Sequence, residues 1–166
     1  MSCQNDLTVD QIKQKITDYA NGYGIDPGLA LAQAQRESGF NPCAVGAAGE
    51  RGLMQFTEAT WATYGQGSFD NAFDVDYNLT AWGNYLSTLL GMFGGDYSQA
   101  LQGYNGGPGH VQNGTVSTAA QGYAQAILSQ AGVVSSSSAG TSSTSGFPVW
   151  LLIGGAVLLG VFLLRD

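Results

Sequence analysis

Apolar residues recur at helical spacing along the first 132 residues of the chain. Val9, Ile12, Ile16 and Tyr19 repeat at intervals of three or four, which is the pattern of an amphipathic helix with one buried face. A longer stretch has the same spacing, with apolar residues at Leu79, Trp82, Leu86, Leu89 and Phe93. No stretch alternates apolar and polar positions for long enough to predict a half-buried strand. The pattern therefore predicts a mainly α domain over residues 1–132, with long glycine-rich connections.

Capping residues, prolines and glycines mark where the predicted helices begin and end. Thr8 and Gln11 have the spacing of a capping box. Asp26 followed by Pro27 predicts the start of a second helix, and Gly39 predicts its end. Later helices are expected to begin at Thr57 (and to end at Gly65), at Asp74 or Asp76, at Asp96 and at Ser117.

The composition changes sharply beyond this domain. Residues 133–146, VVSSSSAGTSSTSG, are too small and polar to build a core, and they predict a flexible linker. Residues 147–164 carry no charge, and as a helix they would cover about 27 Å, close to the hydrocarbon thickness of a bilayer. Trp150 lies near one end, where an interfacial ring is favourable. We expect a single C-terminal transmembrane helix here, and a buried core helix is the alternative.

The net charge and the N-terminal residues argue against a nucleic-acid partner and against a secretory signal peptide. The net charge of −7 leaves no basic surface for phosphates, so we expect no nucleic-acid partner and a neutral or cationic substrate. Residues 1–15, MSCQNDLTVDQIKQK, have neither an apolar core nor a small-residue cleavage site, so we expect no secretory signal peptide. Arg165 follows the predicted span and favours a cytoplasmic side for the C-terminal end.

No metal site is predicted. Cys3 and Cys43 do not have a recognised zinc-binding spacing with His110, the only histidine. The two cysteines either pair or are both free. A disulfide between them would add about 3–4 kcal/mol by restricting the unfolded chain. The acidic residues within 70–76 lack the glycine and terminal glutamate of a calcium-binding loop, and we expect them to cap helices.

Three segments of the domain carry a more specific pattern. The first, ESGFNPCAVGAAGERGLMQF at residues 37–56, places Glu37 at the end of an apolar helical stretch, before a run of small residues. The others are ALQGYNGGPGHV at 100–111 and GYAQAIL at 122–128. In this order and spacing they resemble the signatures of the soluble lytic transglycosylase catalytic domain. The resemblance implies a lysozyme-like α fold that cleaves peptidoglycan glycan strands between N-acetylmuramic acid and N-acetylglucosamine.

The resemblance also implies a role for a single glutamate. Glycosidases that use water work with two carboxylates, whereas lytic transglycosylases use one. Glu37 would protonate the leaving oxygen and then act as base on the C6 hydroxyl of the muramic acid, helped by the substrate's N-acetyl group. The product is a 1,6-anhydro sugar, formed without metal or cofactor. This role requires a raised pKa, which the apolar neighbours of Glu37 favour. Arg36 would lower that pKa, but we expect its side chain to point elsewhere.

Other site residues carry over from the family one at a time. Met54 and Gln55 match a turn that lines the sugar groove. Tyr104 and Asn105 match a pair whose tyrosine hydroxyl lies near the catalytic glutamate, and Tyr123 matches a groove tyrosine. For the two tyrosines, plain core packing is the alternative. The predicted substrate-binding residues are Ser38, Met54, Gln55, Tyr104, Asn105 and Tyr123.

The chain departs from the family pattern around the turn. Residues 57–60 read TEAT where the family commonly has Pro-x-Thr-Ala, and Glu50 and Arg51 stand where small residues are usual. Glu50, or Asp96, would be the second carboxylate if the domain were a goose-type, lysozyme-like hydrolase. An inactive glycan-binding or structural virion membrane protein is the third alternative.

The predicted anchor indicates where such a domain would work. A wall-cleaving domain tethered by its C-terminus is similar in plan to the virion-associated transglycosylases of membrane-containing bacteriophages. This implies a virion membrane, with the catalytic domain facing the cell wall. The implied partners are peptidoglycan, lipid through residues 147–164, and other virion membrane or capsid proteins. A bacterial tail-anchored or secretion-apparatus transglycosylase is the alternative.

Overall fold

The computed structural model describes residue 3 and residues 6–133. In this part of the chain the elements are, in order, α1 (Val9–Tyr23), α2 (Pro27–Ser38), α3 (Glu58–Tyr64), the 3-10 helix η1 (Phe69–Phe73), α4 (Val75–Met92), α5 (Tyr97–Gly106), α6 (Pro108–Gln112) and α7 (Thr118–Ala131). No strand forms among these residues, and only isolated bridges join Arg51 to Val45 and to Phe56. The prediction of a mainly α domain is confirmed.

The predicted capping residues begin the helices. The Thr8 hydroxyl accepts from the backbone N–H of Gln11 at 3.2 Å, and the Gln11 side chain accepts from the N–H of Thr8 at 2.8 Å. Of the two aspartates predicted for α4, Asp74 is the cap. The other caps that the sequence predicted are Asp26, Thr57, Asp96 and Ser117. η1 and α6 were not predicted, because five residues each are too few to show a helical period.

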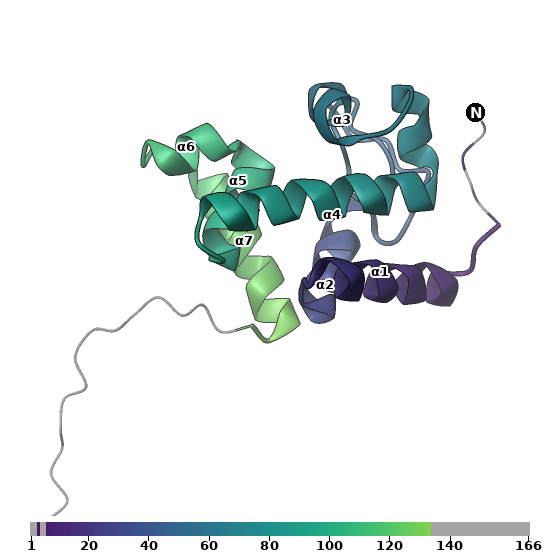
Figure 1. The fold of residues 1–166 in the computed structure, drawn as a ribbon, viewed down its shortest axis with the longest axis horizontal. Helices are drawn as coiled ribbons and strands as arrows, with labels where there is room; N and C mark the ends of the chain where they lie inside the picture. Colours follow the sequence, from purple (N-terminus) through teal and green to yellow (C-terminus); the bar gives the residue numbers. More distant parts are fainter. Residues whose placement is uncertain (1–2, 4–5, 134–166) are drawn as a thin grey trace, which may run out of the picture. The chain divides into compact units, whose positions relative to one another are not determined.

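α4 is the central helix of the described domain. In Figure 1 it runs through the middle, with α1 and α2 along one side and α5 and α7 at one end. Its apolar face is in the core, where Leu79, Trp82, Leu86 and Leu89 are each 0% exposed. α7 packs against both α2 and α5. This packing brings together the three segments on which the family resemblance rests.

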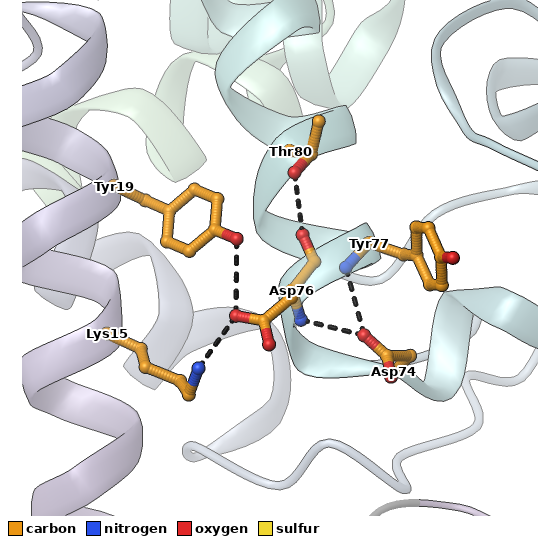
Figure 2. Close-up of polar contacts among 6 residues, drawn as sticks. All are labelled: Lys15, Tyr19, Asp74, Asp76, Tyr77 and Thr80. Carbon is orange, nitrogen blue, oxygen red and sulfur yellow. Dashed lines mark hydrogen bonds and ion pairs between the residues drawn. The ribbon is translucent and has the colours of Figure 1, made fainter.

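A polar contact also joins α1 to the first turn of α4. Figure 2 shows Lys15 and Tyr19 of α1 converging on the Asp76 carboxylate, where Nζ of Lys15 lies at 2.8 Å and the Tyr19 hydroxyl at 3.2 Å. The hydrogen bond that Lys15 donates to the Asp76 carboxylate raises the pKa of Lys15. Because the two side chains are 35% and 49% exposed, the pair contributes at most about 1 kcal/mol. Asp76 therefore links two helices and does not cap one, unlike Asp74.

Cys3 and Cys43 form a disulfide, with their Cα atoms 5.4 Å apart. The sequence left open whether these cysteines pair, and the structure has them paired. The bond ties the segment before α1 to the loop that follows α2. It therefore holds the loop immediately after the helix that carries Glu37.

The predicted transmembrane helix at residues 147–164 lies outside the described residues, as does the predicted linker from residue 134 onward. Within the described part of the chain, none of the helices is long and apolar enough to cross a bilayer.

Candidate active site

Glu37 lies in the last turn of α2, and the chain turns sharply directly after it. Gly39 ends the helix at φ +61°, and Phe40 follows at φ +66°. Glycine adopts this left-handed conformation readily, whereas a residue with a side chain does so only when its surroundings compensate. The Phe40 side chain is buried in the core, which provides that compensation. The turn leaves Glu37 facing α7, where its hydrogen-bond partner lies.

A chain of buried hydrogen bonds ends on the Glu37 carboxyl. Nε1 of Trp82 donates to Oε1 of Gln33 at 2.9 Å, and Nε2 of Gln33 donates to the Tyr123 hydroxyl at 3.0 Å. That hydroxyl in turn donates to Oε1 of Glu37. Gln33 and Trp82 are fully buried and Tyr123 is 4% exposed. Since each member holds the next, the chain fixes the position of the carboxyl.

Sequence reasoning missed Gln33 and Trp82. Gln33 lies one turn before Glu37 on the same face of α2, in a stretch that is otherwise apolar. A buried glutamine needs hydrogen-bond partners for its amide, so a glutamine at this core-facing position could have indicated a buried hydrogen-bond network. Trp82 gave no such signal, because its spacing fits an ordinary core residue.

The environment raises the pKa of the Glu37 carboxyl from 4.5 to about 7. Burial is the largest cause, because it disfavours the charged form. The Tyr123 hydrogen bond and the positive charge of Arg36 lower this pKa, and the negative charge of Glu50 raises it. The Arg36 guanidinium lies 5.4 Å from the centre of the Tyr123 ring. The expectation that Arg36 points away from the site is therefore wrong, but burial outweighs its effect.

The Met-Gln turn contacts α5 through Tyr104. The Tyr104 hydroxyl donates to the carbonyl oxygen of Met54 at 2.8 Å, and the backbone N–H of Met54 donates to Oδ1 of Asn78 at 3.0 Å. The Met54 side chain is 0% exposed, so it packs in the core. The sequence predicted that it lines the sugar groove, and this prediction is wrong for the side chain. The hydroxyl bonded to Glu37 is that of Tyr123, while Tyr104 lines the same cavity as Glu37.

Gln55 has a constrained backbone in this turn. Its φ is +50°, and its Nε2 donates to the carbonyl of Gly52 at 2.8 Å and to that of Ala44 at 3.3 Å. Gly52 itself has φ +80°, and a Cβ there would overlap the carbonyl oxygen of Ala72. A non-glycine residue persists in this conformation only when its surroundings hold it, and such residues gather at functional sites.

The Glu37 hollow is an open cavity of about 290 Å³ in front of the carboxyl. Its lining residues are Glu37, Glu50, Gln55, Thr57, Tyr104 and Asn105. Four of these were predicted site residues, while Thr57 was expected only as a helix cap. Three other predicted residues do not line it: Met54 and Tyr123 are buried, and the Ser38 hydroxyl donates to the Ala34 carbonyl at 3.4 Å.

Asp96 and His110 both lie outside the Glu37 hollow. Asp96 caps the N-terminal end of α5, whereas Asn105 is near the opposite end, about 14 Å along the helix. His110 shares a hydrogen bond of 3.0 Å with the Thr115 hydroxyl and lines a separate, smaller cavity. Of the two carboxylates weighed as partners for Glu37, the structure therefore brings only Glu50 into the site.

Solved structures share this helical fold. An inactive mutant of the lytic transglycosylase Slt from Pseudomonas aeruginosa has a TM-score of 0.63 at 23% identity, over 72% of this chain and 23% of that one. The 70 kDa soluble lytic transglycosylase of Escherichia coli has a TM-score of 0.60 at 24% identity, over 75% of this chain and 23% of that one. The chain thus has the lysozyme-like helical fold that the sequence predicted.

The chain matches the Transglycosylase SLT domain over residues 14–127, and it belongs to this family. The peptidoglycan transglycosylase gp16 of Escherichia phage T7 is 36% identical over 108 residues, which is 63% of this chain and 8% of that protein. The membrane-bound lytic murein transglycosylase C of Photorhabdus laumondii is 38% identical over 104 residues, which is 54% of this chain and 29% of that protein. The chain therefore spans less than a third of the length of these curated relatives.

Removing the Tyr123 hydroxyl should disturb the site more than the fold. In Tyr123→Phe, Glu37 loses the hydrogen bond that lowers its pKa, so that pKa should rise further. We expect cleavage to slow about 10- to 100-fold and its alkaline limb to move to higher pH. A pH profile measures both effects. Tyr77→Phe, at a 39% exposed position, is the matched control and should leave the profile in place.

Replacing Glu37 by Gln should stabilise the protein above neutral pH. The folded protein keeps a proton that the unfolded chain loses near the ordinary pKa of 4.5, so the unfolding free energy falls as pH rises from there to about 7. E37Q should therefore be about 1–3 kcal/mol more stable than the wild type at pH 8, with a smaller gain near pH 4. Urea unfolding measures this, and an equal gain at both pH values would contradict it.

Proposed function

We propose that this chain is a peptidoglycan lytic transglycosylase in which Glu37 performs both proton transfers. The supporting observation is the Glu37 carboxyl, whose pKa of about 7 makes both its forms available near neutral pH. Protonated Glu37 gives its proton to the glycosidic oxygen as the bond from that oxygen to C1 of N-acetylmuramic acid breaks. Ionised Glu37 then takes the proton of the C6 hydroxyl of the same sugar while the C6 oxygen forms a bond to C1. The product is a 1,6-anhydro ring, and no water is consumed.

Three residues that line the Glu37 hollow, Gln55, Tyr104 and Asn105, would bind the sugar. Asn105 is exposed, and the amide of Gln55 is held in place by its hydrogen bond to the Gly52 carbonyl. Tyr104 presents a partly exposed ring that packs on Tyr85 at 5.0 Å, a suitable platform for a sugar face. Ser38, Met54 and Tyr123 support the site from behind.

Hydrolysis is the second candidate, because Glu50 lines the same cavity as Glu37. A hydrolase would use Glu50 to activate water and would leave a reducing end at every cut. Digestion of purified peptidoglycan by the full-length chain, followed by a reducing-end assay, tests the choice. We expect soluble fragments without new reducing ends. One reducing end per cut would support the hydrolase, and no release by folded protein would support the glycan-binding or structural alternative.

We also propose that the chain is anchored in a membrane by residues 147–164 and serves local wall penetration during phage entry. The charge-free segment supports the anchor. A phage peptidoglycan transglycosylase and membrane-bound transglycosylases among the relatives are consistent with this setting. In a flotation experiment, the full-length chain should rise with phospholipid vesicles, and a chain ending at residue 146 should stay behind. If both float equally, the anchor is not at 147–164.

A further inference from the structure

Glu50 is a charged residue of the Glu37 hollow for which the single-glutamate mechanism has no use. It lies on the loop between α2 and α3, and its Oε2 accepts from the backbone N–H of Ala48 at 3.0 Å. The backbone N–H of Gly46 donates to the Glu50 carbonyl at 2.8 Å. A Cβ on Gly46 would overlap Oε2 of Glu50, so the carboxylate is packed tightly against its own loop.

No cation neutralises Glu50 within the described residues. Its neighbour Arg51 forms an ion pair with Asp70 at 2.7 Å and lies 4.4 Å from the centre of the Phe69 ring. Those residues line a different cavity, so consecutive residues of one loop serve two separate hollows. Glu50 and Glu37 are the two charged residues that line the Glu37 hollow.

We propose that Glu50 is a positioning residue whose fixed negative charge holds the proton on Glu37. A negative charge disfavours the ionisation of a second carboxyl that lines the same small cavity, so Glu50 favours the protonated form of Glu37. The groups around Glu37 are Arg36 on its own helix, Tyr123 on α7 and Tyr104 on α5, besides Glu50. Among these neighbours, Glu50 carries the negative charge. It raises the Glu37 pKa, whereas the positive charge of Arg36 lowers it.

The inference rests on the proposed function in one respect: if Glu37 is the general acid, the charge of Glu50 should extend activity to more alkaline pH. Glu50→Gln keeps the size of the side chain and removes the charge. We expect this variant to retain most of its kcat/KM at pH 5.5 and to be about three-fold slower than the wild type at pH 8. Glu58→Gln is the matched control, because Glu58 lines the neighbouring cavity, and its profile should match the wild type.

The test should also follow Glu37 without relying on catalysis. The chain has three glutamates, at positions 37, 50 and 58. Carboxyl labelling of glutamate in the full-length chain therefore gives three NMR signals, which single Glu→Gln variants assign. The Glu37 midpoint should fall in Glu50→Gln and stay in place in Glu58→Gln. An unmoved midpoint in Glu50→Gln would overturn the inference. A lowered midpoint together with reducing-end products would leave the inference standing and overturn the proposed function.

Discussion

Glu37→Gln should abolish glycan cleavage while leaving the protein folded. The substitution keeps an oxygen that can accept the Tyr123 hydrogen bond, but it removes the proton that the leaving oxygen needs. General acid and base catalysis typically contributes two to four orders of magnitude, and Glu37 is proposed for both steps. We therefore expect release of soluble fragments from peptidoglycan to fall by about 10³-fold or more.

The controls separate loss of chemistry from loss of structure. E37Q should still bind insoluble peptidoglycan and should unfold no earlier than the wild type. Glu58→Gln removes a carboxylate of the same size outside the Glu37 hollow, and it should cleave normally. Residual activity of one tenth or more in E37Q, at any pH, would show that another group supplies the proton.

Removing the disulfide should have the largest effect on stability. Cys3 and Cys43 are 40 positions apart, and closing a loop of this length should stabilise the folded state by about 4 kcal/mol through the entropy of the unfolded chain. The double variant Cys3→Ser, Cys43→Ser should lose about that much unfolding free energy in urea. Below the transition it should still cleave, because neither residue lines the Glu37 hollow.

A reductant provides the comparison for this experiment. The wild type unfolded with reductant should match the double variant, and the variant itself should not respond to reductant. A difference of less than about 1 kcal/mol between oxidised and reduced wild type would mean that the bond contributes little.

The helices were predictable from local sequence because their ends are chemically marked. Thr8 with Gln11 forms the predicted capping box, and Asp26 with Pro27 begins α2 as expected. These signals act within four residues, so a sequence contains all of the information needed. The pairing of cysteines was not predictable, since it depends on which distant segments meet.

The site was predictable in its types of residue but not in its contacts. The segment around Glu37 pointed to the carboxyl, and Gln55, Tyr104 and Asn105 do meet it in one cavity. The contact between Tyr123 and Glu37 could not be derived, because it depends on how α7 packs against α2. For the same reason Met54, next to Gln55, could not be recognised as a buried residue whose carbonyl receives the Tyr104 hydrogen bond.

The electrostatics of the site follow from competition among three elements. Burial at the end of α2 is the largest influence on Glu37 and favours its neutral form, while the α7 hydroxyl and Arg36 favour the charged form. Glu50, from the loop, acts in the same direction as burial. The resulting pKa of about 7 suits the proposed role, in which Glu37 first gives a proton and then takes one back.

The central claim, that one carboxyl does the work of two, is tested most directly by the mass of the products. The full-length chain should digest purified peptidoglycan in water enriched in the heavy oxygen isotope, and mass spectrometry should weigh the released fragments. We predict fragments that carry no heavy oxygen and are lighter by one water, about 18 Da, than reducing-end fragments of the same composition formed in ordinary water. Fragments that carry one heavy oxygen at a reducing end would contradict the claim and would indicate hydrolysis assisted by Glu50.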